Sequence, residues 1–121
     1  MDIHETLTSA AKAIGFNLHV NRAGAFQLFK GGKYVRFWNP LSDDSDALQL
    51  AAVLGLRLTM PKYKGFGTSA EPQSGGVARC TVFRDDLMQQ TREAIVLTAS
   101  EMGKQMMQPT KSGDSIRGEK K

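Results

Sequence analysis

The chain has 121 residues, of which 40% are hydrophobic and 23% are charged, a composition typical of one folded globular domain and not of a disordered protein. Its single cysteine, Cys80, excludes an intrachain disulfide framework and a zinc site built on several thiolates. No apolar run approaches the ~20 residues of a membrane span, and the acidic segment Met1–Glu5 differs from a secretory signal, so we expect a cytoplasmic protein without membrane contact.

The net charge of +4 is mild, but the charges are sorted along the chain. The stretch Arg22–Trp38 carries four basic residues and no acidic one, and Gly55–Arg84 carries five basic residues and one acidic residue. Three aspartates, Asp43, Asp44 and Asp46, lie between the two stretches. The basic stretches are therefore the first candidates for contact with an acidic partner.

The first third of the chain predicts one helix and three strands. Apolar residues recur at helical period in Asp2–Ile14, and Gly15 follows where a left-handed C-terminal cap belongs. Alternating apolar residues then predict strands, and the pair Gly31-Gly32 suits a hairpin turn because glycine adopts positive φ without penalty. The predicted strands are Phe16–Val20, Phe26–Phe29 and Lys33–Trp38.

The rest of the chain predicts two more helices and two more strands. The periodicity favours helices over Asp43–Leu54 and Asp85–Met107, and strands over Leu56–Met60 and Val77–Phe83. Four glycines and a proline in Lys62–Gly76 predict a long loop, and loops of that length are usually functional or mobile. The last residues, Gln108–Lys121, have one large apolar side chain and predict a flexible basic tail.

The expected fold class is therefore α+β. The order is α-β-β-β-α-β-β-α, and three amphipathic helices need a sheet face to cover, which favours a small, mostly antiparallel sheet packed by three helices in a sandwich-like arrangement. Residues 1–107 form the single expected domain, and residues 108–121 form the tail.

One segment resembles a known family. Trp38-Asn39-Pro40, the acidic helix start with Asp43, Asp44 and Asp46, and the following Ala47-Leu48 are similar to small phage and prophage proteins with the phage ABA-sandwich domain. The late stretch Thr91–Val96 is similar to the C-terminal helix of that group. The resemblance implies an α/β sandwich and a phage or prophage origin, but no activity, because most members are uncharacterised.

The residues of this segment also have a purely structural interpretation. The Trp38 ring would cover the core, Pro40 would fix the chain direction, and the aspartates would accept hydrogen bonds at the positive end of the helix. The alternative is a Mg²⁺ or Ca²⁺ site built from the three carboxylates. Residues i, i+1 and i+3 at a helix start do not converge on one point, so we expect no metal site.

The sequence offers few candidates for catalysis. We expect His4 and His19 to be ordinary surface residues and Cys80 to be a small core residue, and no nucleophile–base grouping stands out. The expected protein is not an enzyme and needs no cofactor.

Two basic and aromatic segments are the expected contact surface. In the hairpin, Tyr34, Arg36 and Trp38 are expected on one sheet face beside two lysines, and the long loop repeats the mixture of lysine and aromatic residues. The candidate partner-binding residues are Lys30, Lys33, Tyr34, Arg36, Lys62, Tyr63, Lys64 and Phe66.

These features predict a non-enzymatic phage or prophage accessory protein that binds a host macromolecule in the bacterial cytoplasm. The favoured function is a host-defence antagonist of the anti-CRISPR kind, whose partner is a host protein or ribonucleoprotein complex. The alternative is a small nucleic-acid-binding regulator. The feature that distinguishes the two functions is the position of Tyr34, Arg36 and Trp38, which lie either on an open sheet face or beneath a helix.

Overall fold

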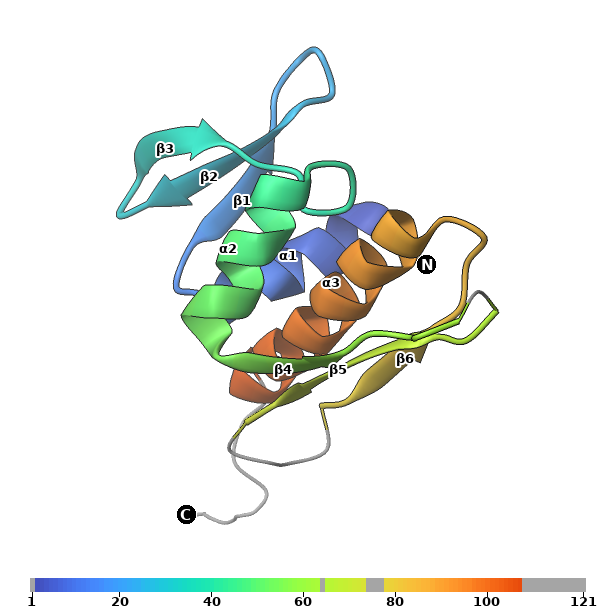
Figure 1. The fold of residues 1–121 in the computed structure, drawn as a ribbon. Helices are drawn as coiled ribbons and strands as arrows, with labels where there is room; N and C mark the ends of the chain where they lie inside the picture. Colours follow the sequence, from blue (N-terminus) through green and yellow to red (C-terminus); the bar gives the residue numbers. More distant parts are fainter. Residues whose placement is uncertain (1, 64, 74–77, 108–121) are drawn as a thin grey trace, which may run out of the picture.

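The computed structural model describes residues 2–63, 65–73 and 78–107 and contains three helices and six strands (Figure 1). The predicted α+β class is confirmed, and the predicted elements occur in the predicted order. The helices are α1 (Ile3–Ala13), α2 (Asp44–Leu54) and α3 (Leu87–Met107). The strands are β1 (Asn17–Val20), β2 (Phe26–Lys30), β3 (Lys33–Phe37), β4 (Leu56–Thr59), β5 (Thr68–Pro72) and β6 (Cys80–Val82).

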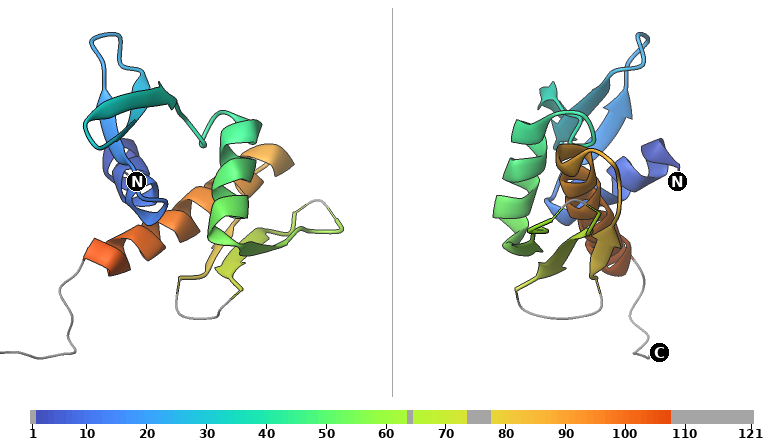
Figure 2. Two further views of the ribbon diagram at one scale, coloured as in Figure 1. Left: turned by 90° about the vertical axis from the view of Figure 1, so that its left-hand side faces the viewer. Right: turned by 45° about the vertical axis from the view of Figure 1, so that its right-hand side comes forward.

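The strands form two small antiparallel sheets in place of the one expected. The N-terminal sheet has the order β1-β2-β3, and the C-terminal sheet has the order β4-β5-β6. The two sheets lie at opposite ends of the molecule, with the three helices between them (Figures 1 and 2). Each sheet thus turns one face toward the shared core and leaves the other face outside.

Strand β5 lies inside the segment that the sequence predicted as a loop, so that prediction is wrong for Thr68–Pro72. The strand pairs with β4 on one side and β6 on the other. Its buried positions alternate, with Thr68, Ala70 and Pro72 inside, and the Thr98 hydroxyl of α3 donates to the Ala70 carbonyl at 3.0 Å. These inward side chains are too small to give a recognisable apolar pattern, although they fit closely beneath α3.

Helix α3 occupies the centre of the molecule. It packs against α1, α2 and the C-terminal sheet, so side chains on all its sides are buried along Gln90–Ser100. Its closest approach is to α1, where a Cβ placed on Gly103 would lie 1.7 Å from the Ser9 carbonyl oxygen. Only glycine fits at this crossing, because the two backbones touch there.

The hairpin of β2 and β3 contains an irregularity that changes which side chains share a face. Gly31 and Gly32 form the turn with φ of +61° and +81°, as the sequence predicts. The register pairs Phe29 with Tyr34 but Leu28 with Arg36, so Val35 is an extra residue in a β-bulge. A bulge reverses the alternation after it, so Tyr34 no longer shares a face with the residues that follow at even positions.

The expectation that Tyr34, Arg36 and Trp38 lie on one face is therefore wrong. Arg36 pairs with buried Leu28 and turns toward α2, and Trp38 is 2% exposed in the core. Tyr34 instead shares the outer face with Phe37, at a ring-centroid distance of 5.9 Å.

Two of the predicted features lie outside the described residues: the basic tail 108–121 and the side chain of Lys64. None of the helices in the described part of the chain is long and apolar enough to cross a lipid bilayer.

Candidate functional site

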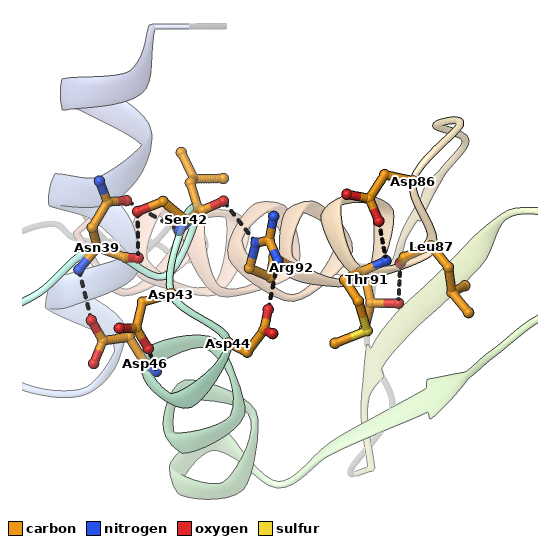
Figure 3. A network of polar contacts seen from close by, with 11 residues as sticks. Asn39, Ser42, Asp43, Asp44, Asp46, Asp86, Leu87, Thr91 and Arg92 are labelled. Atoms are coloured by element: carbon orange, nitrogen blue, oxygen red, sulfur yellow. Dashed lines mark hydrogen bonds and ion pairs between the residues drawn. The ribbon is translucent and has the colours of Figure 1, made fainter.

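The acidic helix start is a closed network of hydrogen bonds (Figure 3). Asp43 is the N-cap of α2, and its carboxylate accepts from the Asp46 amide at 3.0 Å. The Asp46 carboxylate in turn accepts from the Asn39 amide at 2.9 Å and from the Arg36 guanidinium at 2.8 Å. These contacts fix the path of the chain from β3 into α2, as the structural interpretation of the segment predicts.

A second basic residue connects this helix start to α3. The Arg92 side chain donates through Nε to the Leu41 carbonyl at 2.9 Å and pairs through Nη1 with the Asp44 carboxylate. Trp38 and Pro40, which flank Asn39 in the sequence, are buried. Within residues 2–63, 65–73 and 78–107, no three His, Cys, Asp or Glu side chains gather as a metal ion would require. The contacts of Arg36 and Arg92 join α2 to the N-terminal sheet and to α3.

The outer face of the N-terminal sheet carries a row of aromatic rings, here called the aromatic face: His19, Phe29, Tyr34 and Phe37. Successive ring centroids are 4.4 Å, 5.9 Å and 5.9 Å apart, and all three contacts are edge-to-face. Tyr34 is 49% exposed and Phe37 is 57% exposed. The core side of the sheet is formed by Leu18 and Leu28, so the rings face away from the helices.

Basic side chains lie at the tip of the hairpin, where the register places them on the sheet face opposite the aromatic face. Lys30 and Lys33 are exposed cross-strand neighbours, and the Lys30 ammonium lies 5.4 Å from the centroid of the Phe16 ring. No acidic residue occurs in Asn17–Trp38, which includes the whole N-terminal sheet. The sheet therefore combines exposed rings with positive charge.

A second exposed apolar cluster, here called the loop patch, lies at the other end of the molecule: Tyr63, Phe66, Phe83 and Leu87. The Tyr63 and Phe66 rings are 6.4 Å apart and are 64% and 61% exposed. Both line a depression of about 250 Å³ together with Leu87. The exposed Phe83 ring lies against Gly67, next to Phe66, since a Cβ on Gly67 would be 3.0 Å from it.

The loop patch is held in place by one buried side chain, Gln90 of α3, which is 3% exposed. Its amide nitrogen donates to the Phe66 carbonyl and to the Thr68 hydroxyl, each at 3.0 Å. Its amide oxygen accepts from the Arg84 amide at 2.9 Å. Gln90 thus fixes the loop, the start of β5 and the segment before α3 relative to one another.

The structure does not bring the two predicted contact segments together. The turn between β2 and β3 and the loop between β4 and β5 lie on opposite sides of the molecule (Figures 1 and 2). The lysines Lys30 and Lys33 therefore cannot share one surface with Lys62, Tyr63 and Phe66. Sequence reasoning missed His19, Phe29 and Phe37 on the aromatic face, and Phe83, Leu87 and Gln90 at the loop patch.

The residues considered for catalysis occupy ordinary positions. The His19 ring stacks edge-on against Phe29, and the His4 ring lies 6.5 Å from that of Phe26. Burial raises the pKa of the Cys80 thiol, a hydrogen bond with Thr98 lowers it, and the Glu101 charge raises it. A half-buried thiol with a raised pKa is a poor nucleophile.

No family model matches the chain, and neither a curated protein nor a solved structure matches it significantly. The resemblance to phage proteins thus remains a prediction made from the residues around Trp38–Leu48.

Proposed function

We propose that this protein is a non-enzymatic binding protein that docks on a host macromolecule through the loop patch, as a phage-encoded antagonist of host defence would. The observation that supports it is the loop patch itself. Tyr63 and Phe66 project from a connection whose backbone is anchored by Gln90, and they frame a depression that a partner side chain can enter.

Exposed aromatic residues on an anchored loop match the energetics of protein interfaces. Tyrosine is enriched among the few residues that dominate binding energy, and large rings bury much area while losing little conformational entropy. The centroids of two such rings are 6.4 Å apart here, and clustered exposed apolar side chains are typical of interaction sites. Lys62 beside them adds a positive charge that speeds encounter with an acidic partner.

The test first captures a partner from a bacterial lysate and then measures how tightly it binds variants of the loop patch. Tyr63→Ala and Phe66→Ala are each expected to cost about 2 kcal/mol of binding energy, or roughly 30-fold in Kd, because buried rings dominate interfaces. Lys62→Ala is expected to reduce the association rate more than it raises the dissociation rate. Equal affinity of wild type and all three variants would contradict the proposal.

The control for this test is the pair Tyr34→Ala and Phe37→Ala at the opposite end of the molecule. These rings are exposed to a similar degree, so their loss reports any general effect of removing a surface aromatic residue. We expect both control variants to bind the captured protein like wild type. The alternative function, a small nucleic-acid-binding regulator, depends on the aromatic face.

A further inference from the structure

We propose that the aromatic face of the N-terminal sheet binds single-stranded nucleic acid by stacking unpaired bases on Tyr34 and Phe37. This second site uses none of the loop-patch residues, so either proposal can fail without the other.

The arrangement of the rings supports stacking. Phe29, Tyr34 and Phe37 form a continuous row on the paired strands β2 and β3, with centroids 5.9 Å apart at each step. Tyr34 and Phe37 are 49% and 57% exposed, so about half of each side chain is accessible to a ligand. Sheets of comparable size in RNA-binding proteins stack two or three unpaired bases on such rings.

The β-bulge at Val35 creates this row. Without the extra residue, Phe37 would lie on the face opposite Tyr34. Bulges that redirect a side chain occur frequently next to functional sites. The bulge also turns Arg36 inward to Asp46. The Arg36 side chain therefore does not contribute positive charge to the outer face.

The N-terminal sheet has no acidic residue that would repel a polyanion, and its two lysines, Lys30 and Lys33, extend at the hairpin tip from the face opposite the rings. The whole stretch Asn17–Trp38 is free of acidic residues. At the other end of the row, Phe37 borders an open depression that is also lined by Asp43 and Asp46. Phosphates are repelled there, so the backbone of a bound strand is expected to follow the lysine end of the sheet.

A single strand fits better than a duplex. In a duplex the base faces are already stacked on one another, and only the base edges are accessible in the grooves, so no base face is free to stack on the rings. In a single strand every base has a free π-face, and stacking on aromatic side chains contributes without sequence preference.

The experiment is a fluorescence anisotropy titration of the full chain with labelled (dT)12, (rU)12 and a 12-base-pair DNA duplex at two salt concentrations. We expect both single strands to bind with Kd below about 100 µM, the weak limit of non-specific binding, and the duplex to bind at least about tenfold more weakly. The ratio of the Kd values for (rU)12 and (dT)12 then assigns the ligand to RNA or to DNA. Absence of single-strand binding, or equal binding of the duplex, would overturn the proposal.

Substitutions separate stacking from other contacts. Tyr34→Leu and Phe37→Leu keep an apolar side chain but remove the ring, and each is expected to weaken single-strand binding by about 5- to 150-fold. Lys30→Ala and Lys33→Ala are expected to lower the salt slope by about 0.7 each. Val53→Ala, which trims an exposed apolar side chain of α2 outside both the aromatic face and the loop patch, is the control and should change Kd less than twofold.

Leucine variants that bind like wild type would show that the rings do not stack on bases, and the site would then be rejected. A different result would be that the Tyr34→Leu and Phe37→Leu variants still bind a captured protein, whereas Tyr34→Ala and Phe37→Ala do not. The aromatic face would then be an apolar contact for a protein, which also contradicts the proposal. Thermal unfolding of each variant confirms that the exposed substitutions leave the fold intact.

Discussion

The guanidinium of Arg36 lies 2.8 Å from the carboxylate of Asp46, and this pair joins β3 to the first turn of α2. Asp46 is 8% exposed, whereas 41% of the Arg36 side chain remains accessible. The pair is therefore only partly removed from water, and its contribution comes from satisfying a buried carboxylate more than from charge attraction itself.

This geometry predicts a structural and not a binding role for Arg36. Asp46→Ala is expected to cost about 2 to 3 kcal/mol of unfolding free energy, since it leaves the Asn39 amide without its acceptor and Arg36 without its ion-pair partner. Arg36→Ala is expected to cost less, about 1 to 2 kcal/mol. Denaturant unfolding of both single variants and the double variant measures the coupling energy between Arg36 and Asp46. A coupling energy of zero would contradict a stabilising interaction between the two side chains.

The capping role of Asp43 gives the second prediction. Asp43→Ala is expected to lower the unfolding free energy by about 0.5 to 2 kcal/mol, whereas Asp43→Asn should retain most of it, because asparagine is an equally good N-cap. Unfolding is measured with and without Mg²⁺ or Ca²⁺. A large gain in melting temperature with either ion for wild type, but not for Asp43→Ala, would indicate a metal site in place of the cap.

The contact of Gly103 with α1 gives the third prediction. Gly103→Ala places a methyl group against the Ser9 backbone, which cannot yield as a flexible side chain would. We expect a loss of at least about 3 kcal/mol, the upper end of the usual cost of overpacking, or failure to fold. Lys104→Ala at the next position is the control and should change stability by less than about 0.5 kcal/mol. A small effect of Gly103→Ala would mean that the two helices do not cross so closely.

The fourth prediction concerns the anchor of the loop patch. Gln90→Leu preserves volume but leaves the Phe66 carbonyl and the Arg84 amide without their partner, so we expect a loss of about 2 to 3 kcal/mol. Gln105→Leu, at an exposed position of the same helix, is the matched control. Hydrogen exchange of the Thr68 and Arg84 amides reports the local effect. Unchanged exchange in Gln90→Leu would show that the loop is held by other contacts.

Much of the fold follows from local patterns in the sequence. The helix starts at Asp2 and Asp43, the glycine turn at Gly31-Gly32 and the burial of Trp38 are each fixed by residues within one or two turns of chain. These features could be predicted because their physical cause is short-range.

The features that the sequence does not reveal depend on contacts between distant segments. Strand β5 has inward side chains as small as Ala70, and it is recognisable as a strand only by its pairing with β4 and β6. The bulge at Val35 depends on the cross-strand register, and a one-residue shift moves every following side chain to the other face. For this reason the sequence placed Tyr34 beside Arg36, while the structure places it beside Phe37.

The most direct test of the proposed function is hydrogen–deuterium exchange of the full chain with and without the protein partner captured from a lysate. Binding through the loop patch predicts slower exchange in peptides that cover residues 61–67 and 83–87, with unchanged exchange in residues 26–37. Protection confined to residues 26–37, or no protection at either end, would contradict the assignment of the loop patch as the protein-binding surface.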